Sequence, residues 1–199
     1  MKKESKKGQW NWIWTIVIFA IIYLTGYHTE VIGQLQRGIL ATGLLNPSVE
    51  PIQKNEKTTI DLNKTNFTMQ ELNSGSVKSL LSYSGKILFI NIWATWCPPC
   101  RAEMPGIQDL YNEFENSSDI QFIMLSVDDD PNIAHKFIDN KNFTFPVFTL
   151  TMPLPKELQS NSIPTTFIIN QEGEIILKHE GMANYSSKKF KNYLRGLTL

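Results

Sequence analysis

The sequence predicts an α/β domain, with a central mixed β-sheet covered by helices on both sides, preceded by a separate apolar helix. Three observations lead to this prediction. Strand-like and helix-like apolar patterns alternate from about residue 58 onward. The two cysteines stand close together, between a strand pattern and a helix pattern. An uncharged, mostly apolar run near the N-terminus is separated from this region by polar sequence.

The composition is that of a globular protein of moderate size. The chain has 199 residues, of which 42% are hydrophobic, and it carries 19 basic and 19 acidic side chains. This length accommodates one domain and an appendage, since a domain usually takes roughly 100 to 200 residues. A formal net charge of zero gives no electrostatic reason to expect a nucleic-acid partner. Two cysteines are too few to hold a small disulfide-rich fold together.

The N-terminal run has the pattern of an uncleaved transmembrane anchor at 10–28. Residues 10–27 contain no charged side chain, and such a helix is about 27 Å long, close to the roughly 30 Å hydrocarbon core. Aromatic residues flank both ends as interfacial belts: Trp10, Trp12, Trp14, Tyr23 and Tyr27. A signal peptide also has a charged start, but bulky residues stand where signal peptidase requires small ones. We therefore expect an anchor rather than a cleaved segment.

Basic residues indicate the orientation of this anchor. Lysines at positions 2, 3, 6 and 7 precede the run, and the first basic residue after it is Arg37. The positive-inside rule therefore makes 1–9 a cytoplasmic tail of a single-pass protein and places the domain outside the cytoplasmic membrane. Residues 29–57 form a juxtamembrane segment and a polar, proline-containing linker. For 29–46 the sequence leaves open a helix on the membrane surface or a simple spacer.

Residues 58–199 form the predicted domain, and its first half alternates strands and helices. An apolar run rich in β-branched residues predicts a buried strand at 86–92. Apolar residues at helical spacing predict a helix at 97–116. A second strand follows at 120–127, and a second helix at 131–140. This order is typical of parallel strands joined by helical crossovers.

The second half of the domain is predicted to contain a hairpin. A strand is expected at 145–150, and two more at 166–170 and 174–179. Residues 171–173 between the last two have the composition of a hairpin turn. An amphipathic helix at 186–197 ends the pattern.

Cys97 and Cys100 are separated by two prolines at a predicted strand-to-helix junction. Two thiols on a first helical turn can form a disulfide, and the helix N-terminus lowers the pKa of a thiol there. Because a thiolate is the attacking species in disulfide exchange, Cys97, at the exposed edge, is the expected nucleophile. Cys100, one turn deeper, would then attack the mixed disulfide. Pro98 and Pro99 stiffen the turn, where their missing N–H groups have no helical acceptor anyway.

Other uses of the two thiols fit the sequence less well, and we expect neither a cofactor nor a bound metal. Zinc needs about four ligands, and the three histidines are scattered. A c-type haem would need histidine where Arg101 stands. Aspartates 128–130 lack the glycine and the distant glutamate of a calcium loop and are typical of a helix cap. A Cu(I) site on Cys97 and Cys100 remains the alternative, and would make the protein a metallochaperone.

Four stretches occur in an informative order. They are 89–105 around Trp-Cys-Pro-Pro-Cys, then 128–131, 145–147 and 162–170. In these stretches the chain resembles the thioredoxin-like fold, and specifically the membrane-anchored TlpA/ResA group of thiol–disulfide oxidoreductases. The resemblance covers about residues 56–199. Peroxiredoxins share the fold class but have threonine three residues before the reactive cysteine, where this chain has Ala94.

The resemblance implies an enzyme, a membrane-tethered protein-disulfide reductase on the periplasmic side of a bacterial-type membrane. Its implied partners are disulfide-containing proteins, for example apocytochrome c during cytochrome c maturation, and a transmembrane electron donor. The sequence does not determine the direction of electron flow, because related dithiols span roughly −270 to −120 mV.

Glu103 is the expected proton carrier. It follows Cys100 by three positions, on the same side of the helix, and it can exchange a proton with a thiol if burial raises its pKa. The alternative is an acid that merely complements the helix dipole. Thioredoxins carry a buried aspartate on the preceding strand, where this chain has Asn91. Since asparagine does not titrate, the resemblance to ResA-like proteins places proton handling at Glu103.

Three further residues complete the predicted site, and together with Pro98 and Pro99 they are the expected substrate-binding groups. Pro164 matches the family's cis-proline loop, which lies opposite the cysteines. A cis bond there would turn the Ile163 backbone toward the substrate and offer strand-like hydrogen bonds to an extended peptide. Trp96 is expected to add apolar contact, although ordinary packing would explain it almost as well.

Overall fold

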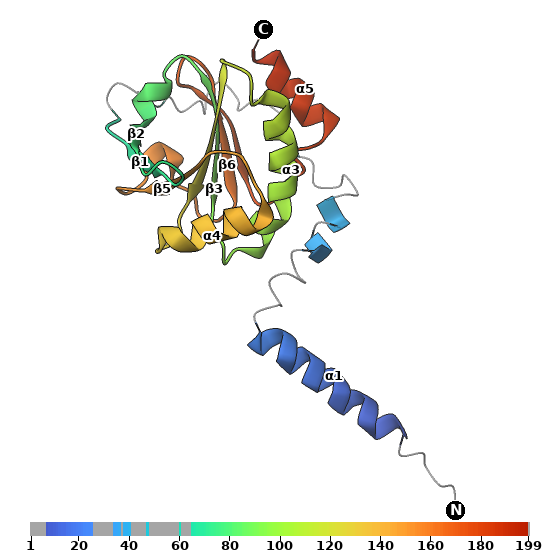
Figure 1. Ribbon diagram of the computed structural model, residues 1–199. Coiled ribbons are helices and arrows are strands. Elements are labelled where there is room, and N and C mark those ends of the chain that lie inside the picture. The colour runs from blue at the N-terminus through green and yellow to red at the C-terminus, as the bar shows by residue number, and fades with distance from the viewer. Residues whose placement is uncertain are drawn as a thin grey trace, which may run out of the picture.

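The computed structural model describes residues 7–25, 34–36, 38–40, 47, 60 and 65–198. The tail lysines at positions 2, 3 and 6 and most of the segment at 29–57 lie outside the described residues. Helix α1 (Lys7–Leu24) covers most of the predicted anchor and lies apart from the α/β unit (Figure 1). Among the described residues, no helix has both the length and the apolar character needed to cross a membrane.

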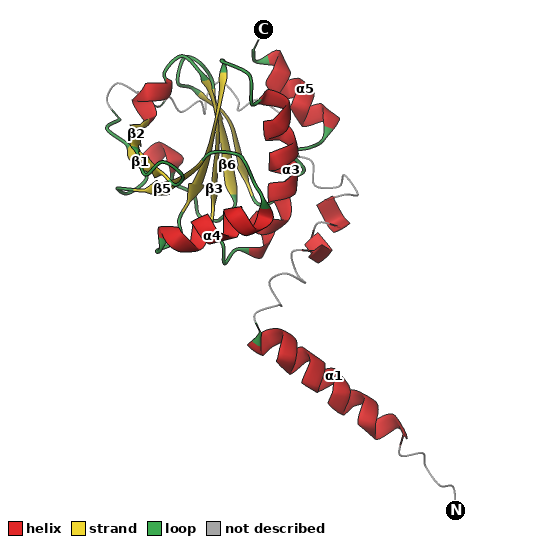
Figure 2. Cartoon of the chain, in the orientation of Figure 1, coloured by secondary structure: helices red, strands yellow, loops and turns green. Residues whose placement is uncertain are grey.

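The domain contains one mixed seven-stranded sheet, shown in yellow in Figure 2. Its strands are β1 (Thr68–Glu71), β2 (Val77–Ser79), β3 (Ile87–Trp93), β4 (Ile120–Ser126), β5 (Val147–Leu150), β6 (Thr165–Ile169) and β7 (Ile175–Glu180). Their order across the sheet is β2-β1-β5-β4-β3-β6-β7. The β3–β4 and β4–β5 pairs are parallel, and the others are antiparallel. The predicted mixed sheet is therefore confirmed.

Three α-helices and two 3-10 helices accompany the sheet. The α-helices are α3 (Pro98–Phe114), α4 (Pro131–Lys141) and α5 (Lys188–Gly196), and the 3-10 helices are η1 (Leu80–Tyr83) and η2 (Lys156–Leu158). Every element predicted in the domain is present, with ends within two residues of those expected. The short elements β1, β2, η1 and η2 were not predicted.

The three α-helices pack on the same face of the sheet, which corrects the prediction of helices on both sides. Buried side chains of α3, α4 and α5 belong to one core cluster, together with alternate residues of the strands. The opposite face is covered by a second cluster that includes Ile60, Leu80 of η1 and Leu158 of η2. The strand order explains this arrangement. The crossovers β3–α3–β4 and β4–α4–β5 advance in the same direction, and right-handed crossovers then place both helices on one face.

Strand β3 runs through the centre of the sheet and leads directly to the cysteines. All of its residues are buried because both of its faces are covered. Trp93, the last residue of β3, is fully buried. The parallel neighbour β4 ends beside β3, with Ser126 paired to Trp93. The carboxyl ends of two central strands therefore frame the strand-to-helix junction.

Candidate active site

The cysteine pair lies where β3 passes into α3, and its two sulfur atoms form a disulfide. Cys97 is the N-cap residue of α3, and its Sγ accepts the backbone N–H of Cys100 at 3.2 Å. Pro98 and Pro99 occupy the first two helical positions, where an N–H has no intrahelical partner. A partial positive charge at this helix N-terminus stabilises a thiolate at Cys97 once the disulfide is reduced.

The two cysteines differ slightly in access to solvent. Cys97 is 4% exposed and Cys100 is fully buried. In the disulfide form Cys97 is therefore much less exposed than the sequence predicted. The neighbouring Trp96 side chain is 62% exposed, so it lies on the surface next to Cys97 and not in the core. Of the two sulfur-bearing residues, Cys97 is thus the more accessible.

The loop before β6 faces Cys97. The Ile163–Pro164 bond is cis, as the resemblance implied. The Ile163 carbonyl oxygen is 3.7 Å from Cys97 Sγ. The structure therefore brings together the cysteine pair and two of the predicted substrate-binding residues, although they are more than sixty positions apart in the sequence.

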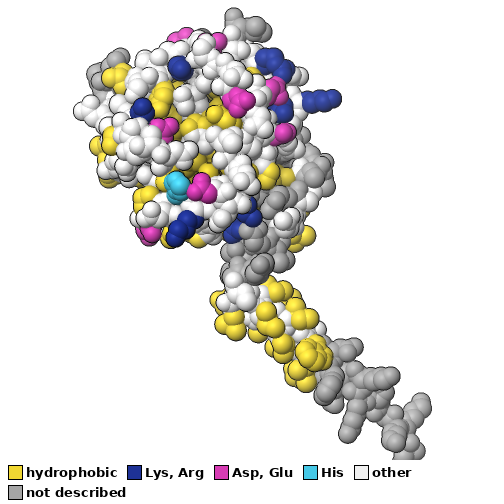
Figure 3. All heavy atoms as spheres, in the orientation of Figure 1, with side chains coloured by type: hydrophobic (Ala, Val, Ile, Leu, Met, Phe, Trp, Pro, Cys, Tyr) yellow, Lys and Arg dark blue, Asp and Glu magenta, His cyan; other side chains and the backbone are white. Residues whose placement is uncertain are grey.

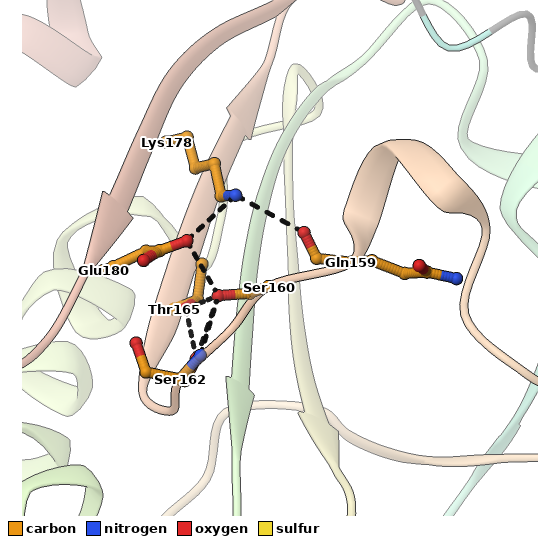
Figure 4. A network of polar contacts seen from close by, with 6 residues as sticks. All are labelled: Gln159, Ser160, Ser162, Thr165, Lys178 and Glu180. Atoms are coloured by element: carbon orange, nitrogen blue, oxygen red, sulfur yellow. Dashed lines mark hydrogen bonds and ion pairs between the residues drawn. The ribbon is translucent and has the colours of Figure 1, made fainter.

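A polar network, shown in Figure 4, ties this loop to strand β7. Ser160 Oγ lies 3.1 Å from Glu180 Oε1 and 3.0 Å from the Ser162 carbonyl oxygen. Lys178 Nζ is 2.9 Å from the same Glu180 oxygen. Hydrogen bonds from Lys178 and Ser160 also lower the pKa of the exposed Glu180 carboxyl. These contacts hold the chain just before Ile163. No local sequence pattern predicts them, because they join a loop to a distant strand.

Glu103 lies inside the protein, with only 1% of its surface exposed. Its Oε1 accepts Asn91 Nδ2 at 2.8 Å, and its Oε2 accepts the Ala183 backbone N–H at 3.0 Å. Burial raises the pKa of this carboxyl to about 8, against the opposing effect of the two hydrogen bonds. An exposed acid that only complements the helix dipole would show no such shift. The burial that proton exchange at Glu103 requires is therefore present.

Asn91 connects Glu103 to the sheet. Its Nδ2 donates to Glu103 and also to Thr166 Oγ1 at 2.8 Å. Asn91 Oδ1 has no hydrogen-bond partner among the described residues. Burial, and after it the charge of Glu103, raises the pKa of the buried Tyr185 phenol. Thr166 and Tyr185 were not singled out in the sequence, since an isolated threonine or tyrosine carries no spacing signal.

Asp128 is a second residue whose role was missed. The sequence indicated only that the aspartate run caps a helix, and Asp130 does so by accepting the Asn132 N–H. Asp128 instead accepts the Thr95 backbone N–H at 3.0 Å and the Thr95 hydroxyl at 2.7 Å. It therefore fixes the turn that precedes Cys97. Its position just after a parallel strand next to β3 is the signal that would have identified it.

The described residues contain no group of three or more His, Cys, Asp and Glu side chains that could hold a metal ion. The candidate site is therefore built from a redox-capable disulfide, a buried carboxyl with a raised pKa and a backbone acceptor opposite the sulfur.

Comparison with known proteins gives consistent results. The AhpC/TSA family matches residues 62–178. The thiol-disulfide oxidoreductase ResA of Halalkalibacterium halodurans is 32% identical over 117 residues, which are 58% of this chain and 65% of that protein. ResA of Oceanobacillus iheyensis is 37% identical over 107 residues, 53% of this chain and 55% of that protein. The matched region thus spans less than two thirds of either relative.

A solved structure supports the same grouping. StoA from Bacillus subtilis superimposes with a TM-score of 0.55 at 26% sequence identity, over 64% of this chain and 95% of StoA. The chain therefore belongs to the AhpC/TSA family and to its TlpA/ResA group of thiol–disulfide oxidoreductases.

Proposed function

We propose that this protein is a thiol–disulfide oxidoreductase that reduces disulfides of protein substrates. The observation that carries the proposal is the Cys97–Cys100 disulfide at the N-terminus of α3, with only Cys97 reaching the surface. A disulfide that opens and closes at this position can exchange electrons with a substrate disulfide. The names of the matched relatives support the same chemistry.

The reaction begins with both cysteines reduced. The Cys97 thiolate attacks one sulfur of a substrate disulfide, so that a Cys97–substrate bond forms and the substrate S–S bond breaks. The leaving substrate thiolate takes up a proton. Cys100 then attacks Cys97 Sγ, the Cys97–Cys100 bond forms, and the second substrate thiolate leaves. In total, two electrons pass from the protein dithiol to the substrate disulfide.

Glu103 supports the second step. Cys100 is fully buried and has no contact with solvent. Its thiol therefore needs a group inside the protein to accept its proton. Glu103, one turn further along α3, is buried with it and exchanges protons near neutral pH, because its pKa is raised to about 8. The carboxylate form accepts the proton when Cys100 becomes nucleophilic.

The substrate docks as an extended peptide between Trp96 and the Ile163–Pro164 loop. The exposed indole of Trp96 offers apolar contact beside the nucleophile. The Ile163 carbonyl, opposite Cys97, accepts a hydrogen bond from a peptide N–H, in the manner of an added strand. Pro98 and Pro99, which follow Cys97 and are half-buried, belong to the same substrate-binding surface.

The chain is tethered to the cytoplasmic membrane through residues 10–28, with the domain on the outer side. The support is the apolar surface of α1, where most side chains from Trp12 to Leu24 are exposed (Figure 3). In this setting a membrane electron donor reduces the disulfide again, and apocytochrome c is a candidate substrate. Cell fractionation tests the tether: the full chain should sediment with membranes after a high-salt wash, and recovery in the soluble fraction would contradict it.

The direction of electron flow is tested by the reduction potential. We expect the Cys97–Cys100 couple to equilibrate toward the reducing end of the roughly −270 to −120 mV range of related dithiols. The measurement is redox titration in glutathione and dithiothreitol buffers, with the thiols counted by mass after alkylation. A potential at the oxidising end would replace the reductase by an enzyme that introduces disulfides.

A further inference from the structure

A buried proton carrier needs a route to water, and the structure contains a pocket that reaches Glu103. The pocket has a volume of about 220 Å³ and lies against α3 beside Pro105, which stands inside the helix. Its opposite wall is the loop after β7, including Ala183 and Asn184. A water molecule takes about 30 Å³ in the liquid, so this space holds several waters. Glu103 is therefore almost inaccessible in the static fold, but it is one of the residues that line a space able to hold water.

Leu40 forms part of the same pocket, although it comes from the segment between α1 and the domain. Its side chain is only 7% exposed. Asn184 Nδ2 donates a hydrogen bond to the Leu40 carbonyl oxygen at 3.3 Å. By contrast, Leu35 in the same segment is 71% exposed. One residue of this segment is thus seated on the domain at the pocket, and a nearby residue of the same type is not.

We propose that this pocket is the path by which Glu103 exchanges its proton with water, and that Leu40 is a positioning residue that forms its outer wall. The proposal rests on the proposed function, in which Glu103 serves the cysteine pair. The Leu40 side chain contributes apolar surface only, so its presence limits how many waters approach the carboxyl. The segment that joins α1 to the domain therefore influences proton transfer at the active site.

The groups around Glu103 allow this influence to be measured cleanly. On its own helix, the titratable neighbour is Cys100. From the loop after β7 it faces the Tyr185 phenol, which stays protonated because burial raises its pKa well above the usual range. Asn91 from β3 and Thr166 from β6 carry no titratable proton. With the disulfide closed, Glu103 is therefore the group in this cluster expected to ionise between pH 5 and 9.

The experiment is infrared titration of the buried carboxyl in the oxidised full-length protein. The protonated-carboxyl band of Glu103 is identified by its loss in Glu103→Gln. In Leu40→Ala more water reaches the carboxyl, which favours the charged form, so the titration should move to lower pH by about one unit or more. Leu35→Ala is the matched control and should titrate as the wild type does.

A second variant should shift the titration of Glu103 in the opposite direction. Gly106 lines the pocket, and a Cβ at this position would lie 3.6 Å from the Ser186 backbone nitrogen, an ordinary contact. Gly106→Ala should therefore fit, narrow the pocket and move the titration to higher pH. If Leu40→Ala titrates like the wild type, or Gly106→Ala moves to lower pH, the proposal is overturned.

The infrared titration tests the role of Leu40 separately from the proposed function. It requires no substrate and no turnover, so it stands even if the protein reduces no disulfide. If the wild-type protein reduced no disulfide substrate, the proposed function would be wrong. An unchanged titration in Leu40→Ala would rule out only the role of Leu40.

Discussion

Cys100→Ser should leave the protein covalently attached to its substrates through Cys97. The first step of the exchange needs only the Cys97 thiolate, which the helix N-terminus stabilises. The second step needs the Cys100 sulfur, and a hydroxyl cannot replace it as nucleophile. Mixed disulfides should therefore accumulate and catalytic turnover should fall to the uncatalysed background. Non-reducing gels followed by mass spectrometry of the linked peptides provide the measurement.

The matched control for this variant is Cys97→Ser, which should trap nothing. Cys100 is fully buried, so it does not reach a protein disulfide in the first step. Equal yields of mixed disulfide from the two variants would contradict the assignment of Cys97 as the nucleophile. Release of the complexes by dithiothreitol confirms that the link is a disulfide.

Glu103→Gln should slow turnover by about 100-fold, which is at the low end of general acid–base effects. The neutral amide cannot accept the Cys100 proton. The variant should also lose the ionisation near pH 8 from the pH profile of the exchange rate, because that ionisation belongs to the Glu103 carboxyl. Glu115→Gln, at the exposed C-cap of α3, is the control and should keep the wild-type profile.

The same substitution should change how stability depends on pH. The pKa of Glu103 is about 8 in the folded protein and about 4.5 when unfolded, so the folded chain binds more protons between these values. The free energy of unfolding therefore falls as pH rises from 4.5 to 8, by an amount on the order of a few kcal/mol. Glu103→Gln should remove this contribution and gain stability relative to the wild type at pH 8.5. Urea unfolding at pH 5 and 8.5 measures the difference.

The surroundings of position 103 can accommodate the glutamine side chain of Glu103→Gln. At position 103 the amide oxygen can accept the Ala183 N–H, as Glu103 Oε2 does. If the Asn91 amide turns over, its unpartnered Oδ1 accepts the new N–H group. We therefore expect the variant to fold. A relative stability that does not depend on pH would show that Glu103 ionises normally in the folded protein.

The long elements of this fold were predictable from sequence, and the reason is their periodicity. The apolar run of β3 and the helical spacing in α3 each repeat over several residues, so the pattern exceeds chance. Strand β2 has only three residues and no such pattern. The placement of α3 and α4 on one face could not be read from the order of elements along the chain, because it depends on the order of strands across the sheet.

The site was predictable to the extent that its residues share a local pattern. Cys97, Cys100 and Glu103 follow one another on a single helical turn and the next, so spacing alone connected them. Asp128 and Leu40 could not be connected in this way. Their contacts, with Thr95 and Asn184, depend on the tertiary fold.

The central claim, that Cys97 and Cys100 pass an electron pair to a substrate disulfide, is tested most directly by counting thiols. Fully reduced protein is mixed without oxygen with a peptide that contains one disulfide, and both products are alkylated and weighed. We expect one Cys97–Cys100 disulfide to form for each peptide disulfide that is reduced. Two results would contradict the central claim. In one, the peptide disulfide stays intact and both protein thiols remain free; in the other, the peptide is reduced but the protein dithiol is not oxidised.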